Sequence, residues 1–133
     1  MSEKQVNFYS VIIGTELLNG RRQDAHFSFF NSQLLQRGWE QKASFVIADD
    51  PKLMFDIFNF IKGDPNSVMF CFGGIGATPD DYTRQTAARA FTDYKMEFHE
   101  EAKNRIINQF GQEAYPHRIN MAYLPINAKL LTN

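Results

Sequence analysis

The sequence has little of what marks secreted, membrane-bound or nucleic-acid-binding proteins. Its 133 residues include one cysteine, Cys71, so no disulfide can form within the chain, which fits a reducing cytoplasm. No apolar run approaches the roughly 20 residues that cross a bilayer, and the charged start "MSEKQVNFYS" lacks the apolar stretch of a signal peptide. The net charge of −1 lacks the basic excess typical of nucleic-acid binders. We therefore expect a cytoplasmic protein that binds neither membranes nor nucleic acid.

What the sequence does have is the composition of a globular domain. It is 44% hydrophobic and 22% charged, which argues against disorder, and its 13 phenylalanines suit a well-filled core. A length of 133 residues is enough for one domain with a real core. We expect a single domain over residues 1–133.

Strand-like and helix-like segments alternate along the chain. Apolar runs predict strands at 8–13, 39–47, 67–72 and 119–124. Helical spacing predicts helices over 24–38, 50–63, 80–91 and 99–110, and the mixed charges of 95–103 favour an exposed helix start. Asp24 and Asp50 stand where helix N-caps belong, and Gly38 where a left-handed terminator belongs. This alternation favours an α/β fold of three layers, α/β/α, with a mostly parallel central sheet.

Three loops follow predicted strands, at 14–24, 48–51 and 73–81. Right-handed crossovers would place all three at the carboxyl edge of the sheet, where open α/β folds bind their ligands. They also carry most of the residues able to do chemistry. We expect the functional site at this edge.

The third loop is the richest in glycine. Gly73, Gly74 and Gly76 can leave backbone N–H groups uncovered, Thr78 can add a hydroxyl, and Asp80 or Asp81 begins the next helix. Together these features predict an anion site that suits a phosphate. The loop fits neither the Walker A pattern nor the dinucleotide fingerprint. The alternative is a tight strand-to-helix turn capped by an aspartate.

Carboxylates beside a phosphate would repel it unless a cation lay between them. A Mg²⁺-type ion binds carboxylate and phosphate oxygens together, so Asp81 and Asp49 are candidates to hold it or to orient a water. Asp50, before Pro51, is instead expected to be a helix cap.

Other polar residues leave both a functional and a structural interpretation open. Glu16 and Asp24 are either ligands or solvated loop charges, and Arg21 and Arg22 either clamp a phosphate or face solvent. Cys71, inside an apolar strand, is interpreted as a core residue rather than a nucleophile. The three histidines show no zinc-ligand spacing.

Four segments carry a resemblance to a known family. They are "IGTELLNG" (13–20), "VIADDP" (46–51), "GGIGATPDDYTRQTA" (73–87) and "MAYLP" (121–125). In order and spacing they resemble the molybdopterin-binding MoaB/Mog-like superfamily, most closely the N-terminal domain of the competence-damage-inducible CinA proteins. The resemblance implies a three-layer α/β domain that commonly forms oligomers and binds a phosphorylated ligand at the carboxyl ends of its strands.

The resemblance also implies roles for individual residues. Asp81 and Thr83 match the family's Asp-x-Thr, and Asp49 matches the acidic residue of the second loop. The phosphate cradle and the first loop are matched by Gly73, Gly74, Gly76, Gly14, Thr15 and Glu16. The sequence departs from the family at Ala77, where proline is usual, and at 24–26, where Asn-Thr-Asn is frequent. It also ends where family members continue into Asn-Pro-x-Gly-x-Ala-Pro-Gly, so we expect the domain to lack the family's C-terminal segment.

Three functions stay open on the sequence, and with them whether the chain is an enzyme. One is a module that binds molybdopterin or a nucleotide, or adenylylates the pterin, in molybdenum cofactor biosynthesis. The second is a metal-dependent pyrophosphatase acting on ADP-ribose-type substrates, with Asp49 and Asp81 as the catalytic and metal-holding residues. The third is a non-catalytic interaction or regulatory domain.

Overall fold

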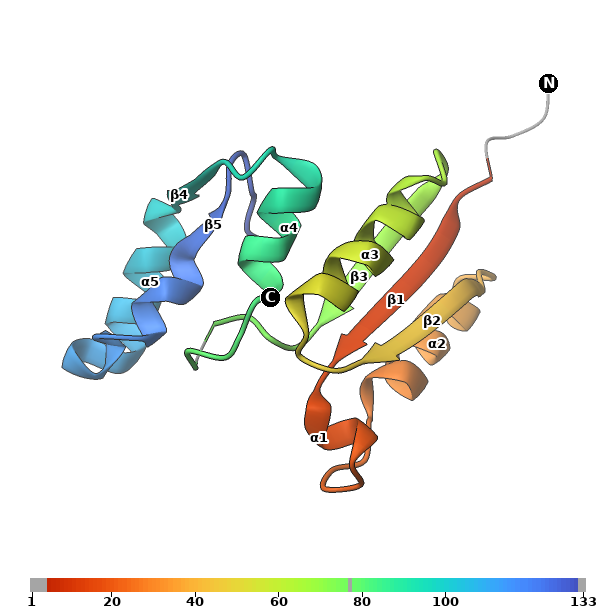
Figure 1. The fold of residues 1–133 in the computed structure, drawn as a ribbon, viewed down its shortest axis with the longest axis horizontal. Coiled ribbons are helices and arrows are strands. Elements are labelled where there is room, and N and C mark those ends of the chain that lie inside the picture. Colours follow the sequence, from red (N-terminus) through yellow and green to blue (C-terminus); the bar gives the residue numbers. More distant parts are fainter. Residues whose placement is uncertain (1–4, 77, 132–133) are drawn as a thin grey trace. The chain divides into compact units, whose positions relative to one another are not determined.

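The computed structural model describes residues 5–76 and 78–131, and the chain forms two compact units (Figure 1). Unit 1 is Met1–Gly73 and unit 2 is Gly74–Asn133. The division falls inside the glycine-rich loop.

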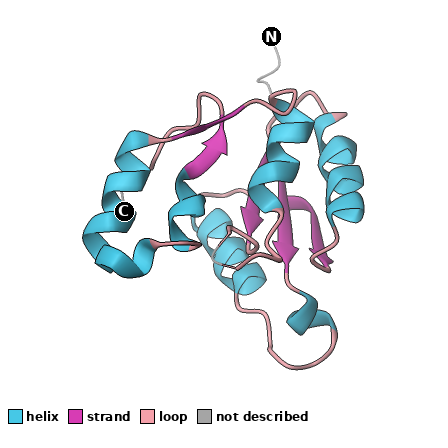
Figure 2. Cartoon of the chain, turned by 60° about the vertical axis from the view of Figure 1, so that its left-hand side comes forward, coloured by secondary structure: helices cyan, strands magenta, loops and turns pink. Residues whose placement is uncertain are grey.

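Unit 1 is built on a parallel sheet. Its strands are β1 (Asn7–Ile13), β2 (Gln41–Ile47) and β3 (Ser67–Phe72), in the order β2-β1-β3. The helices α2 (His26–Gln36) and α3 (Pro51–Lys62) cover opposite faces of this sheet (Figures 1 and 2). The predicted α/β fold with a mostly parallel central sheet is therefore confirmed.

The ends of α3 follow from its sequence. The Asp50 carboxylate accepts hydrogen bonds from the N–H groups of Lys52 and Leu53 at 3.0 and 3.4 Å. Pro51 stands in the first turn, where its missing N–H costs nothing. Asp50 is thus the expected cap. The expected left-handed terminator Gly38, after α2, has φ +76°.

The core of unit 1 lies on both faces of β1, against α3 on one face and against the buried Phe30 and Leu34 of α2 on the other. Its fully buried side chains are Ser10, Val11, Ile12, Met54, Phe58 and Ile61. Ser10 is the polar member, and its Oγ lies 2.6 Å from both Gln41 Oε1 and Ser44 Oγ on β2. A buried hydroxyl with two partners costs little and favours a single register between β1 and β2.

Unit 2 is mainly helical. Its helices are α4 (Thr83–Phe91) and α5 (Glu100–Phe110), with the 3₁₀ helices η1 (Gly111–Ala114) and η2 (Arg118–Ala122). Two short strands, β4 (Met96–Phe98) and β5 (Tyr123–Pro125), pair antiparallel. The rings of Phe98 and Tyr123 lie 4.9 Å apart across this pair.

Two local predictions for unit 2 are wrong. The predicted strand 119–124 is η2 followed by β5, and neither belongs to the parallel sheet. The buried residues Ile119 and Ala122 stand three apart, which is the period of a 3₁₀ helix rather than of a strand. The predicted helix start at 95–103 contains β4, because Glu97 and Phe98 pair with residues of β5.

Asp64, just after α3, ties together the N-terminal ends of two strands. Its Oδ2 accepts hydrogen bonds from the Tyr9 hydroxyl at 2.7 Å and the Asn7 amide at 2.8 Å, and its Oδ1 accepts from the Asn66 N–H at 2.9 Å. Hydrogen bonding, first of all from Tyr9, lowers the pKa of Asp64 to about 2. These donors favour the ionised carboxylate in the folded state.

The stability of the folded protein is expected to depend on pH through the Asp64 carboxylate. An unfolded aspartate titrates near pH 3.9, so the stabilisation from Asp64 is complete above that pH and is lost as the pH falls towards about 2. We expect Asp64→Asn to have a lower urea midpoint than the natural protein at pH 6. The difference between the two midpoints should become smaller by pH 2.5. Asp56→Asn, which removes an exposed carboxylate of α3, is the control. An equal difference at both pH values would contradict the prediction.

Candidate functional site

The first and second loops meet in unit 1 through Thr15 and Asp49. The backbone N–H of Thr15 donates to Asp49 Oδ2 at 3.4 Å, and the N–H of Asp49 donates to Thr15 Oγ1 at 3.2 Å. Thr15 opens a short helix that was not predicted, α1 (Thr15–Leu18). The structure thus brings together two residues that the sequence placed in one site, and Thr15 orients the Asp49 carboxylate.

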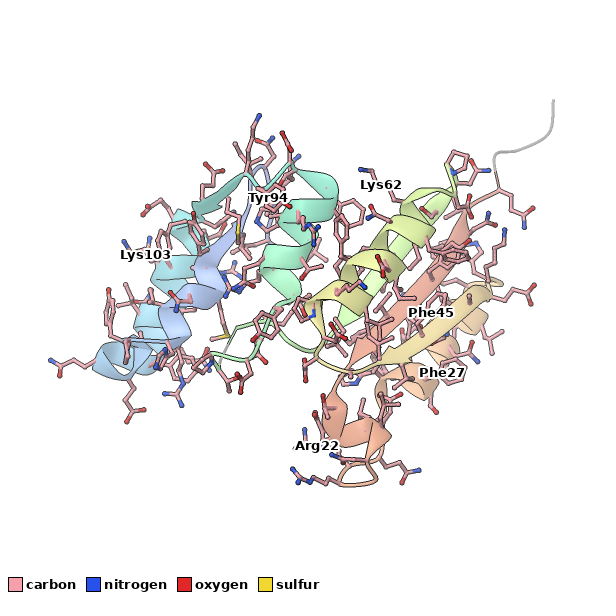
Figure 3. The ribbon with its side chains drawn as sticks, in the orientation of Figure 1. Arg22, Phe27, Phe45, Lys62, Tyr94 and Lys103 are labelled. Atoms are coloured by element: carbon pink, nitrogen blue, oxygen red, sulfur yellow. The ribbon has the colours of Figure 1, made fainter. Side chains whose placement is uncertain are left out.

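Gly14 and Glu16 lie beside this contact. The Gly14 N–H donates to the Ile47 carbonyl at 3.0 Å, which extends the pairing of β1 with β2. The Glu16 carboxylate folds back over Gly14, and its Oε1 lies 2.9 Å from where a Cβ on Gly14 would stand. A side chain at position 14 would therefore displace Glu16. Arg21 and Arg22 are exposed in the loop that follows, where Figure 3 labels Arg22.

Asp24 has a structural role at the start of α2. Its carboxylate accepts hydrogen bonds from the N–H groups of His26 and Phe27 at 2.9 and 3.0 Å and contacts the His26 ring. Partial burial opposes ionisation, but these hydrogen bonds outweigh it and lower the pKa of Asp24. Asp24 therefore holds the start of α2 from one position before the N-cap, which is Ala25 and not Asp24 as expected.

In unit 2, the third loop folds around Asp81. Asp81 Oδ2 accepts hydrogen bonds from the N–H groups of Gly76 at 3.2 Å and Thr78 at 3.1 Å. The prediction that Asp80 or Asp81 begins the helix is wrong, because α4 starts at Thr83 without a side-chain cap. Instead, the Thr83 N–H donates to the Gly74 carbonyl at 3.0 Å. Two N–H groups of the loop thus converge on one point, and that point is a carboxylate of the chain itself.

Two glycines of this loop are required by their surroundings. Gly73 has φ +95°, and a Cβ there would lie 2.2 Å from the Ile13 carbonyl oxygen. Gly76 has φ +124°, and a Cβ there would lie 2.5 Å from Nε of Arg84. L-residues rarely adopt either conformation, so any other residue would be both strained and obstructed. Ala77 lies outside the described residues.

Arg84, on the first turn of α4, is a buried cation beneath the loop. Its Nε donates to the Ile75 carbonyl, and its Nη1 donates to the Tyr123 carbonyl at 2.7 Å. Burial lowers the pKa of Arg84, and the charge of Asp81 partly offsets this effect. Arg84 thereby links the loop to β5 and places a positive charge next to Gly76.

A small polar cavity opens between the loop and η2 in unit 2. Its volume is about 180 Å³, and its lining includes Gly76, Thr78, Asp81, Arg84, His117 and Asn120. Polar groups from three segments therefore face one space.

Residues 10–129 match the family described as a probable molybdopterin binding domain. The match covers most of the chain and both units. The chain belongs to this family.

Similar proteins carry related names. A CinA-like protein of Citrifermentans bemidjiense is 30% identical over 125 residues, which are 91% of this chain and 30% of that relative. A CinA-like protein of a Sulfurihydrogenibium species is 27% identical over 128 residues, 92% of this chain and 31% of the relative. The chain spans about a third of the length of these two relatives.

Solved structures show the same fold. The CinA protein of Thermoplasma acidophilum, described as of unknown function, superposes with a TM-score of 0.83 at 26% identity, covering 96% of this chain and 75% of that one. The molybdopterin biosynthesis enzyme MoaB of Thermus thermophilus superposes with a TM-score of 0.62 at 14% identity, covering 89% and 71%. At 14% identity, the similarity to MoaB shows a shared fold and nothing more.

Within this molybdopterin binding domain, the predicted site residues fall into two groups. Gly14, Thr15, Glu16, Asp49 and Gly73 belong to unit 1, and Gly74, Gly76, Thr78, Asp81 and Thr83 belong to unit 2. The pairing of Asp49 with Asp81 around a cation stays a prediction. Among the described residues, no three histidine, cysteine, aspartate or glutamate side chains are grouped as a metal site.

Three polar residues that line the cavity were not predicted from the sequence. Arg84 was placed on a helix but given no role, and His117 and Asn120 were not connected with the loop. No local signal marks them, because the Arg84 bond to Tyr123 spans 39 residues.

Cys71 fits its interpretation as a core residue rather than a nucleophile, since burial raises the pKa of its thiol to about 12. Over residues 5–76 and 78–131, no helix is both long and apolar enough to cross a membrane.

Proposed function

We propose that the glycine loop of this domain binds the phosphate of a small ligand, molybdopterin or a nucleotide, and that the protein serves molybdenum cofactor biosynthesis. The observation that carries the proposal is the convergence of the Gly76 and Thr78 N–H groups on one oxygen. Backbone donors arranged in this way are suited to an oxyanion. The family description supports a pterin, and the likeness in fold to MoaB, a molybdopterin biosynthesis enzyme, supports the biosynthetic role.

Charge in unit 2 supports the same ligand class. Arg84 lies beneath Gly76, and a guanidinium is a strong partner for phosphate oxygens. Thr78 is exposed and its hydroxyl can donate to the ligand, while Thr83 is buried at the start of α4. We assign Gly73, Gly74 and Gly76 to the shape of the loop, and Gly14, Thr15 and Glu16 to contacts from the first loop.

Asp49 and Asp81 are proposed to hold a Mg²⁺-type cation and to orient a water. Each carboxylate uses Oδ2 for its hydrogen bonds, and Oδ1 of each has no donor among the described residues. Carboxylate oxygens with this freedom are the ligands that hard cations prefer, so the residues fit the ion. A bound cation would neutralise phosphate oxygens, while Thr15 keeps the Asp49 carboxylate in place.

The test is ligand-dependent thermal unfolding with a molybdopterin precursor, ATP and ADP-ribose, each with and without Mg²⁺. A ligand at 100 times its Kd should add about 2.7 kcal/mol of stability. We expect Asp81→Asn to reduce the Mg²⁺-dependent shift while leaving the unliganded melting temperature nearly unchanged, because it removes charge but little volume.

The outcomes separate the candidate functions. A shift with the pterin precursor supports cofactor biosynthesis, whereas hydrolysis of ADP-ribose that requires Mg²⁺ would assign a pyrophosphatase. No shift with any phosphorylated compound would leave a non-catalytic interaction domain and refute the proposal.

We further propose that the protein is a homo-oligomer that uses an apolar surface of unit 1. Phe8 stacks on the half-exposed Trp39 with ring centroids 5.3 Å apart, and the exposed residues Leu35 and Val68 line the same groove of about 890 Å³. An exposed apolar groove of this kind is typical of an interface. Light scattering should report a dimer or trimer, and a monomer at high concentration would contradict the proposal.

A further inference from the structure

The anion position of the glycine loop is occupied by Asp81. Its Oδ2 receives the N–H groups of both Gly76 and Thr78, at 3.2 and 3.1 Å. The neighbouring Asp80 is exposed on the same turn. The Asp81 N–H in turn donates to the Thr78 carbonyl at 3.2 Å, so the turn holds its own carboxylate in place. A ligand phosphate and the Asp81 carboxylate would therefore require the same two donors.

Arg84 gives this position a lasting positive charge. The residue is 7% exposed, and two of its nitrogens, Nε and Nη1, bind backbone carbonyls. The third, Nη2, has no hydrogen-bond partner among residues 5–76 and 78–131, and Arg84 lines the polar cavity. Burial disfavours the charge of this guanidinium, and the nearby charge of Asp81 partly offsets that effect. An incoming oxyanion could take over this role.

The size of the cavity restricts what enters it. Its volume of about 180 Å³ is below the roughly 300–1,000 Å³ of pockets that enclose whole small ligands. His117 and Asn120 form the wall that η2 and its preceding turn supply. The space therefore suits one phosphate group, with the remainder of a ligand outside it.

We propose that Asp81 is an internal competitor of the ligand. Its carboxylate fills the anion position of the free protein, and a single phosphate group binds by displacing it. The phosphate then receives the N–H groups of Gly76 and Thr78, with Arg84 as its counter-charge. A phosphate carries more negative charge than a carboxylate, so it gains more from these donors. This inference rests on the proposed function and adds that ligand arrival releases Asp81 from the loop.

The test is titration of the protein with inorganic phosphate and pyrophosphate in EDTA, so that no cation contributes. Asp81→Ala frees both N–H groups, and we expect it to bind pyrophosphate at least about tenfold more tightly than the natural protein. Asp80→Ala is the matched control, because it removes the same charge from the same turn without freeing a donor. We expect a change of about twofold or less for the control, since the charge it removes is solvent-exposed and screened.

Two results would overturn the displacement. One is unchanged or weaker pyrophosphate binding by Asp81→Ala, and the other is an equal gain in both variants, which would mean general repulsion. The tighter binding expected for Asp81→Ala in EDTA is opposite in direction to the weaker ligand effect expected for Asp81→Asn with Mg²⁺. If the natural protein binds a phosphorylated compound but Asp81→Ala gains nothing, the displacement alone fails. If no form binds any phosphate, the proposed function fails as well.

A second measurement does not depend on the variant folding. In isotope-labelled natural protein, pyrophosphate should shift the amide signals of Gly76 and Thr78 together with the carboxyl carbon signal of Asp81, at one common midpoint. A response of the amides with an unmoved Asp81 carboxyl would overturn the proposal.

Discussion

Replacing Gly73 with alanine is expected to destabilise the protein by more than about 3 kcal/mol. The left-handed conformation at φ +95° costs a residue with a Cβ about 1–2 kcal/mol. The new Cβ would also lie 2.2 Å from the Ile13 carbonyl oxygen, which is backbone at the end of the central strand. Neither atom can rotate away, so β1 and β3 would have to separate where they end, and overpacking of this kind adds about 1–3 kcal/mol.

Gly38→Ala is the matched control for this substitution. Gly38 has a similar φ of +76°, but no heavy atom lies within 4 Å of the position of its Cβ. Gly38→Ala should therefore lose only the stability that the left-handed conformation costs, about 1–2 kcal/mol. Urea unfolding of both variants measures the difference. Equal losses would show that the contact with Ile13 is relieved at no cost.

Phe58→Ala is expected to cost about 3–5 kcal/mol, because truncating a fully buried phenylalanine removes its transfer energy and leaves a cavity. Phe58 lies in the middle of α3 and is 0% exposed. Met54 and Ile61 of the same helix are also fully buried, and a close-packed interior can collapse only partly around the missing ring.

The same helix provides the control. Phe60, two residues further on, is 65% exposed and meets Phe45 edge-on at 6.0 Å. Phe60→Ala should lose little beyond that ring contact, about 0.5–1.5 kcal/mol. If calorimetry found Phe60→Ala as damaging as Phe58→Ala, the core would not lie between α3 and β1.

The parts of the fold that were predictable are those set by neighbouring residues. Asp50 before Pro51 caps α3, and Gly38 ends α2, because capping depends on groups two or three positions apart. The apolar runs of β1 and β3 indicate strands of a parallel sheet, but the expectation of a buried strand holds only for the central β1, because β3 lies at the edge of the sheet. The rule that ligands bind at the carboxyl ends of strands brought Thr15 and Asp49 into one site, and their hydrogen bonds confirm that contact.

The features that could not be predicted from the sequence depend on the backbone conformation of a loop or on partners far along the chain. Asp81 resembled a helix cap, but the positive φ of Gly74 and Gly76 turns the loop so that its own N–H groups reach the carboxylate. Arg84 resembled an ordinary helix residue, because its partner, the Tyr123 carbonyl, is far along the chain. The segment 119–124 was misassigned because one short apolar run fits period two as well as period three.

The strand order of unit 1 also has a consequence for synthesis on the ribosome. β1 is made first but lies in the centre, so its second edge is covered only when β3 is complete, 59 residues after β1 ends (14 to 72). At roughly 5–20 residues per second, this interval lasts about 3–12 s. During it, one edge of an apolar strand is open to pairing with other nascent chains. We therefore expect the yield of folded protein to depend on how quickly residues 14–72 are translated.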